Sequence, residues 1–300
     1  MSGPASRTLL YGGYGVHMDA LDLIESCAPT HVAVGVNAVL TANHHHVWQL
    51  RGDIERDGDR YADQLRRRGS AVCVHAWLAG DERFVVEAAR SCARLALKWG
   101  AAAVVPNPEL PFWGTTDERL LAKKPQEREA LVRAAQADKV KLCRRFIEVL
   151  REEGWRGAVW PAVFYWVPAP VREMVRLSTG LIAQMQSFSN PNKPGHGLEI
   201  MKPGVRQRDA WRKLAPWRRP EDPSWIMFGQ QALYHQAGFG GDELESVRLA
   251  CDTYLDGAQA LSEAGLAFWE LLWLRRHRWA QQALKMYSPR VNEHSERWRP

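Results

Sequence analysis

The sequence predicts an α/β protein folded as a single (β/α)8 barrel of the TIM type, with a long loop after the sixth strand. Short apolar runs typical of strands alternate with longer amphipathic stretches typical of helices, about eight times in 300 residues. The strand-like runs are continuously apolar, as buried parallel strands are. Because these units take up nearly the whole chain, we expect one barrel over residues 1–287 and a polar C-terminal tail over residues 288–300.

The N-terminal half contains four apolar runs with the length and character of strands: Thr8–Tyr11, His31–Val39, Ala71–Leu78 and Ala101–Val105. The fourth run is expected to end at Pro106 and Pro108, because proline cannot donate a hydrogen bond to a central ladder. Apolar residues at helical spacing predict the helices Leu21–Ser26, Tyr61–Arg68, Glu82–Trp99 and Arg128–Glu153.

The C-terminal half repeats this pattern. Strands are expected at Gly157–Trp166, Leu181–Phe188, Trp225–Gln231 and Leu266–Trp273, and helices at Val171–Leu177, Glu243–Glu263 and Trp279–Met286. The connection 190–223 is rich in proline, glycine and basic residues, so it is either a lid over the barrel mouth or a disordered surface insertion. A doubly wound sheet is the alternative fold, but the Gly-rich run Tyr11–Gly15 lacks the G-x-G-x-x-G spacing.

Composition narrows the class of protein. There is no apolar run of about 18 residues, so we expect no membrane span, and no signal peptide at Met1–Arg7, which favours a cytoplasmic protein. The five scattered cysteines are expected to be buried free thiols. The net charge of +6 suits an anionic partner, but basic and acidic residues are interleaved and no nucleic-acid motif is present. We therefore expect no nucleic-acid partner.

Three consecutive histidines, His44–His46, follow the second predicted strand. Three adjacent side chains cannot all face one metal ion in regular structure, and no carboxylate stands near them at ligand spacing. A loop is the better interpretation, and we expect neither a metal nor another cofactor.

Polar and aromatic residues are concentrated at the predicted strand ends, where a barrel carries its active site. The set is rich in amides and aromatic rings and poor in carboxylates, and the chain contains 14 Trp. Aromatic faces stack on sugar rings and amides pair with hydroxyls, so this composition favours a neutral polyhydroxylated ligand. Its members are Tyr11, Tyr14, Asn37, His75, Trp77, Asn107, Glu109, Tyr165, Gln184, Gln186, Gln230, Trp269 and Glu270.

Glu109 is the most informative of these residues. It lies at the predicted mouth, close in sequence to Phe112 and Trp113, so burial should raise the pKa of its carboxyl group. A carboxylic acid protonated near neutral pH can act as a general acid. The alternative is an ordinary surface glutamate in a proline-rich loop.

The segment Ala101–Glu109 resembles the fourth strand of chitinase-like and lysozyme-like glycoside hydrolase barrels, which ends in D-x-E. The segment Ala183–Phe188 is similar to the sixth strand of the same barrels, whose polar side chains face the sugar. The resemblance covers residues 85–190 and implies that Glu109 is the proton donor. Asn107 stands where the family has aspartate, so the negative charge that stabilises the reaction there is missing.

Two hypotheses follow. In the first, the protein hydrolyses a bacterial cell-wall or chitin-type glycan, and it would need lysis or delivery to reach a cell wall. Glu109 is then the general acid, Asn107 orients the sugar and Glu270 is a second carboxylate, although Glu270 could instead be structurally paired. In the second, an inactive barrel binds a glycan or is a structural component of a phage-like, injection-type or secreted assembly. An enzyme of unrelated chemistry remains a third reading. The expected glycan-binding residues are His75, Trp77, Trp113, Tyr165, Gln184, Gln186, Gln230 and Trp269.

Overall fold

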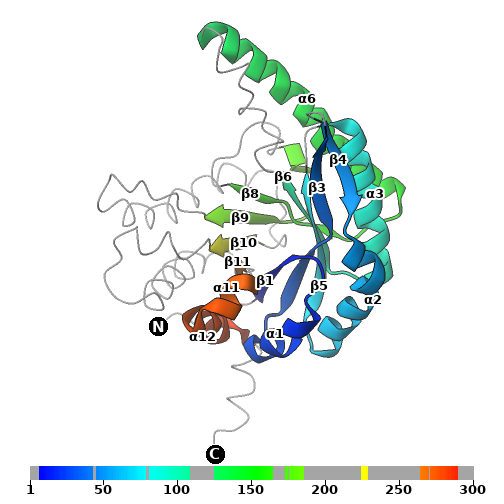
Figure 1. The fold of residues 1–300 in the computed structure, drawn as a ribbon. Helices are drawn as coiled ribbons and strands as arrows, with labels where there is room; N and C mark the ends of the chain where they lie inside the picture. The colour runs from blue at the N-terminus through cyan, green and yellow to red at the C-terminus, as the bar shows by residue number, and fades with distance from the viewer. Residues whose placement is uncertain are drawn as a thin grey trace, which may run out of the picture.

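The structure, a computed structural model, shows parallel strands curled around a common axis, with helices on their outer face (Figure 1). It describes residues 7–42, 45–78, 81–108, 125–164, 173–174, 176–185, 224–228, 264–269 and 271–289.

In the N-terminal half, strands and helices alternate as predicted. The strands of the barrel are β1 (Arg7–Tyr14), β2 (His31–Gly35), β5 (Ala71–Leu78) and β6 (Ala103–Pro108). The helices are η1 (Met18–Ala20), α1 (Leu21–Cys27), α2 (Gly52–Arg67), α3 (Glu82–Trp99) and α6 (Pro125–Glu152). Helix α3 illustrates the local signals, because the Asp81 side chain accepts a hydrogen bond from Phe84 N–H at its start and Gly100, with φ +57°, ends it.

In the C-terminal half, the described strands are β7 (Ala158–Val159), β8 (Ala162–Phe164), β9 (Leu181–Met185), β10 (Ser224–Phe228) and β11 (Ala264–Trp269). Two helices follow, α11 (Leu271–Arg276) and α12 (Arg278–Tyr287). The predicted helix 243–263, the lid-like connection 190–223 and residues 290–300 lie outside the described residues. The predicted domain boundary after residue 287 therefore stays a prediction.

The strand pairing closes a ring. Strand β1 pairs in parallel with β2 and also with β11, so the first and last strands are neighbours. Only Trp160 and Pro161 separate β7 from β8, and β7 pairs with β6 while β8 pairs with β9. Counted as two halves of one strand, they reduce the nine-stranded order to eight parallel strands. The predicted (β/α)8 barrel is confirmed, and the doubly wound sheet is excluded.

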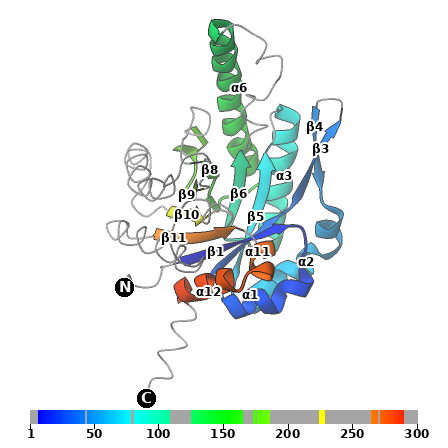
Figure 2. The same cartoon turned by 60° about the vertical axis from the view of Figure 1, so that its left-hand side comes forward.

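The second predicted strand was wrong in its second half. Strand β2 ends at Gly35, and the chain then leaves the barrel as an antiparallel hairpin of β3 (Asn37–Ala42) and β4 (His45–Leu50), which rises beside α3 (Figure 2). The predicted loop at His44–His46 was also wrong, because His45 and His46 belong to β4. The apolar run continues from one sheet into the other without a turn signal, so its pattern could not reveal the boundary.

Two other strand ends differ from the prediction. Strand β6 continues through Pro106 and Pro108 in register with β5, whereas its pairing with β7 involves only Ala103 and Val104. The prolines therefore lie beyond the β7 ladder, where their missing N–H groups matter less. The eighth strand ends at Trp269 rather than Trp273, because Leu271 begins α11.

The core has two layers. The outer layer lies between the strands and the helices, and the inner layer fills the barrel. Small residues on most strands leave room inside for Tyr11 and Trp160. The inner layer consists of Leu9, Tyr11, Ala33, Cys73, Ala103, Val105, Trp160, Ala162, Ile182 and Ala267.

The expectation for the cysteines is confirmed for the four that are described. These are Cys27, Cys73, Cys92 and Cys143, all buried free thiols. Among the described residues, no helix combines the length and apolar character needed to cross a bilayer.

Candidate functional site at the barrel mouth

The described polar residues at the C-terminal ends of neighbouring strands form one group. His75 of β5 lies in register with Gly35 and Val105 on the two adjacent strands. Trp77 of β5 lies in register with Asn107 of β6, one layer nearer the strand ends. Because side chains alternate along a strand, Trp77 shares the face of His75. This end of the barrel is where (β/α)8 enzymes place their active sites.

His75 is enclosed by aromatic rings. The Tyr11 ring meets it edge-on at a centroid distance of 5.1 Å, and the Tyr14 ring lies 5.6 Å away at a tilt of 48°. Only 2% of His75 is exposed, and burial lowers its pKa to about 3. The imidazole is therefore neutral at neutral pH, and it is suited to hydrogen bonding rather than to accepting a proton in catalysis.

Asn37 holds the backbone of Trp77. Its amide Nδ2 donates to the Trp77 carbonyl oxygen at 3.0 Å, and its Oδ1 accepts from the Trp77 N–H at 3.0 Å. Asn37 is 1% exposed, whereas Trp77 is only partly buried. A side-chain amide thus takes the place of a strand neighbour beyond the end of β2, and it holds the partly buried Trp77 at the mouth.

Asn107 is buried at the end of β6, with 1% of its surface exposed. An amide at this depth can donate and accept hydrogen bonds but carries no charge. The structure therefore contains a neutral group at the position that the family resemblance gives to aspartate.

A second set of contacts fixes the loop after β1. The Gly15 N–H donates to the Gly35 carbonyl at 2.8 Å, and the Asp53 carboxylate accepts from the Val16 N–H at 3.2 Å. Arg51 binds both oxygens of the same carboxylate at 3.1 Å. Gly15 has φ +93°, and a side chain there would collide with Asp53. These contacts hold the loop that directly follows Tyr14, the last residue of β1.

The structure thus brings together three of the predicted site residues, His75, Trp77 and Asn107, on neighbouring strands. Two more have only their backbones described: Gln184 on β9 pairs with Met227, and Trp269 on β11 pairs with Tyr11. The roles of all five remain predictions. The other predicted site residues lie outside the described residues, and these are Glu109, Trp113, Tyr165, Gln186, Gln230 and Glu270.

Three residues of the mouth were in the predicted strand-end set but were given no role in binding or catalysis: Tyr11, Tyr14 and Asn37. Their positions at strand ends were a usable signal. Their contacts with His75 and Trp77 were not, because they join segments about 40 to 60 residues apart in sequence.

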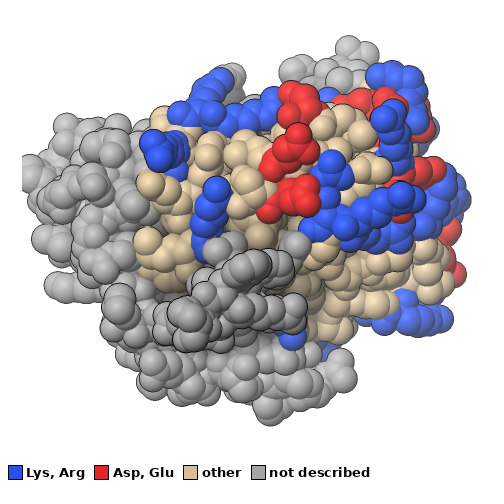
Figure 3. Space-filling model, turned by 90° about the horizontal axis from the view of Figure 1, so that it is seen from below, with Lys and Arg blue, Asp and Glu red and all other residues tan. Residues whose placement is uncertain are grey.

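Charge and metal-binding groups give no competing site in the described part of the chain. On the face shown in Figure 3, basic and acidic side chains lie next to one another. Ion pairs of opposite charge also occur along α2, where Asp63 pairs with Arg66 and Arg67. Within the described ranges, no group of three His, Cys, Asp or Glu residues could hold a metal ion.

No protein-family model and no curated protein sequence matches the chain. Solved structures do match over almost the whole length. The chain is similar to a chitinase from Chromobacterium violaceum, with a TM-score of 0.56, 12% identity, and 95% of this chain and 99% of that one covered. An endoglucanase, Cel5A from the hyperthermophilic Thermotoga maritima, is similar with a TM-score of 0.57 and 11% identity, and 90% of each chain is covered.

An inhibitor protein is about as similar to this chain as the two hydrolases are. The xylanase–α-amylase inhibitor protein XAIP-I, solved in complex with trehalose, gives a TM-score of 0.55 at 13% identity, with 93% of this chain and 98% of that one covered. At such identities the likeness shows the fold alone. The chain has the (β/α)8 barrel fold found in these glycoside hydrolases and in this inhibitor protein.

Proposed function

We propose that the protein binds a neutral glycan at the C-terminal mouth of its barrel. The observation that carries this proposal is the composition of the described mouth. Two tyrosine rings enclose a histidine that stays neutral at neutral pH, and the buried amides of Asn37 and Asn107 lie near the same strand ends. Aromatic faces stack on sugar C–H groups, and neutral amide and imidazole groups pair with hydroxyls without demanding a charged ligand. The occurrence of the same fold in a chitinase and an endoglucanase supports this choice of ligand.

We further propose that the barrel hydrolyses a bacterial cell-wall or chitin-type glycan. Glu109, one residue beyond the end of β6, would protonate the leaving oxygen, and the buried amide of Asn107 would orient the sugar. Glu270, directly after β11, would be the second carboxylate. Trp77 and Trp269 would stack on the sugar, together with the remaining predicted binding residues named above.

A second candidate is a barrel that binds a glycan without cleaving it, as a component of a phage-like or secreted assembly. The neutral Asn107 favours it, because loss of a negative charge in a buried site removes a large stabilisation of a developing cation. The same fold in the inhibitor protein XAIP-I supports a non-hydrolytic role.

Hydrolysis of labelled peptidoglycan and of chitin oligomers would separate the two candidates. We expect turnover by the wild type that falls at least about 100-fold in Glu109→Gln and is unchanged in Glu148→Gln, an exposed glutamate on α6. Turnover that survives Glu109→Gln would refute this residue as the acid. Binding without turnover, with turnover gained in Asn107→Asp, would favour the inactive barrel.

A further inference from the structure

We propose that Asn37 is a positioning residue for glycan binding that acts entirely through Trp77. This inference rests on the proposed glycan-binding function and gives a role to a residue that is absent from the expected glycan-binding residues. Both hydrogen bonds of Asn37 go to the backbone of Trp77 and not to its indole ring.

The pairing of β5 shows why a clamp is needed there. Strand β2 ends at Gly35, and one further backbone contact, from Val36 N–H to the His75 carbonyl at 3.0 Å, continues its ladder. Strand β5 extends beyond this contact to Leu78. Strand β2 is therefore too short to pair with Trp77. The Asn37 side-chain amide takes its place and hydrogen-bonds to both the N–H and the carbonyl of Trp77.

Trp77 is consequently held on both sides. Asn37 binds it on the β2 side, and β6 lies on the other, with Asn107 in register. An aromatic residue whose backbone is already fixed loses less conformational freedom when its ring stacks on a sugar. Asn37 therefore raises affinity by preorganising Trp77 and without touching the glycan.

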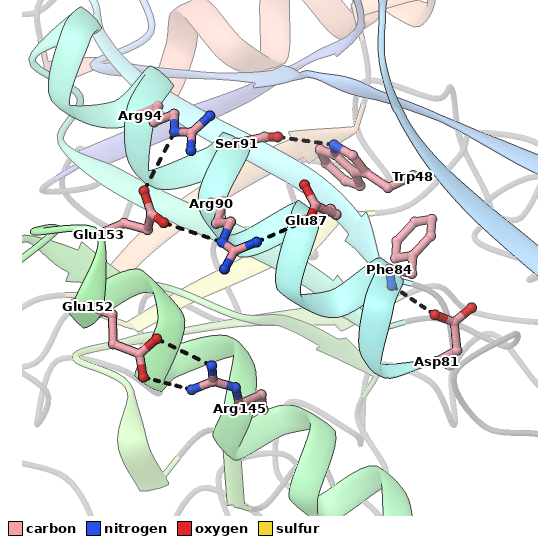
Figure 4. A network of polar contacts seen from close by, with 10 residues as sticks. All are labelled: Trp48, Asp81, Phe84, Glu87, Arg90, Ser91, Arg94, Arg145, Glu152 and Glu153. Carbon is pink, nitrogen blue, oxygen red and sulfur yellow. Dashed lines mark hydrogen bonds and ion pairs between the residues drawn. The ribbon is translucent and has the colours of Figure 1, made fainter.

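The position of Asn37 is itself fixed by the β3–β4 hairpin. At the base of the hairpin, the Arg51 N–H donates to the Val36 carbonyl at 3.0 Å. Farther along, Trp48 of β4 packs edge-on against Phe84 of α3 at 5.4 Å, and its Nε1 donates to the Ser91 hydroxyl at 3.1 Å. These contacts anchor the hairpin, whose first residue is Asn37, against α3 of the outer helix layer (Figures 2 and 4).

A double-mutant cycle tests this inference directly. The affinities of the wild type, Asn37→Ala, Trp77→Ala and the double variant for chitotetraose and for cellotetraose would be measured by titration calorimetry. We expect Trp77→Ala to weaken binding about tenfold and Asn37→Ala about threefold to tenfold. In the Trp77→Ala background, Asn37→Ala should change affinity less than about twofold, because its effect depends on the ring.

A matched control separates the clamp from a general loosening of the outer layer. Asp59→Ala removes the hydrogen bond that Asp59 accepts from Trp99 Nε1, which involves neither the hairpin nor Trp77, so it should leave affinity within about twofold of the wild type. If Asn37→Ala does not fold, Asn37→Asp replaces it in the cycle, because it keeps an acceptor for the Trp77 N–H and loses the donor to the carbonyl.

The outcomes are distinguishable. If the wild type binds neither saccharide, the proposed function fails, and the inference fails with it. If the wild type binds but the effects of Asn37 and Trp77 variants add, or Asp59→Ala weakens binding as much as Asn37→Ala, the inference alone is overturned.

Discussion

Two histidines, His31 partly buried and His75 fully buried, lie at opposite ends of the barrel interior. His31 begins β2, its Nδ1 lies 2.9 Å from the Thr30 hydroxyl, and the Trp160 ring meets it edge-on at 5.6 Å. His75 lies near the C-terminal end of β5, between Tyr11 and Tyr14. Burial, with a smaller contribution from Arg7 for His31, lowers their pKa values to about 4 and about 3 respectively.

The comparison shows that a strongly lowered pKa does not by itself mark a functional site. The two imidazoles are in the same neutral state for the same main reason, burial. They differ in position, because the N-terminal end of a (β/α)8 barrel serves stability and its C-terminal end carries the site. They also differ in their neighbourhood, since Trp160 is 4% exposed and Trp77 near His75 is partly open.

Removing the large aromatic residue from each end should give opposite results. Trp160→Ala should lower the free energy of unfolding by about 3–5 kcal/mol, because it leaves a cavity in the inner core, and it should spare saccharide affinity. Trp77→Ala should lower stability by about 1 kcal/mol and lose most of the affinity. Chemical denaturation and calorimetry on both variants check this, and equal losses of affinity would contradict the division between the two ends.

Acidification should destabilise the fold through both histidines. Their pKa is about 6.5 in the unfolded chain, so between pH 6.5 and about 4 the unfolded chain binds protons that the folded protein does not. The free energy of unfolding should therefore fall as pH falls, by about 1 kcal/mol per pH unit for each histidine. Urea unfolding at pH 7, 5.5 and 4.5 measures this fall in the free energy of unfolding.

Substitution separates the two contributions. His31→Gln and His75→Gln should each reduce the slope between pH 6.5 and 4.5, and part of the remainder comes from His17, whose pKa is also lowered by burial. A slope that neither variant changes would show that the histidines are not the titrating groups.

Lys139 of α6 tests whether burial alone also lowers the pKa of a group outside the barrel. It is 7% exposed, its Nζ has no hydrogen-bond partner among the described residues, and burial lowers its pKa to about 8. Between pH 8 and 10.5 the unfolded chain keeps a proton that the folded protein loses, so stability should rise with pH in that window. Lys139→Met should add about 1–2 kcal/mol at pH 7 and abolish the rise, as measured by urea unfolding. A loss of stability on this substitution would point to a compensating partner.

The smallest effect is expected where charges are exposed. Arg145 and Glu152 on α6 form two hydrogen bonds at 2.7 and 3.3 Å on the outer surface (Figure 4). Solvent screens such a pair, so Arg145→Ala should change the free energy of unfolding by about 0.5 kcal/mol or less, and still less in high salt. Thermal unfolding with and without NaCl at about 0.5 M, a concentration that strongly screens the attraction between exposed charges, checks this prediction. A larger, salt-independent loss would show that the pair is effectively buried.

The helices and most strands could be predicted because each has a local signal. The bounds of β5 and α3 match the predicted segments residue for residue, since each is an uninterrupted periodic run. The β3–β4 hairpin could not be predicted, because Gly35 and Asn37 interrupt an apolar run only through contacts with distant strands. At Gly35, a side chain would collide with the Tyr14 ring and the Gly13 carbonyl.

The sequence by itself determined the alternation of strands and helices, the closed-barrel class and the chemical character of the strand ends. Periodicity and residue type are local properties, so they can be recognised without knowing which strands are neighbours. Only the tertiary structure decided that Tyr11 and Tyr14 enclose His75, that burial keeps this histidine neutral, and that Asn37 holds Trp77. Desolvation and hydrogen-bond partners depend on which distant segments meet. The pairing of β1 with β11 closes the barrel and so decides which segments become neighbours.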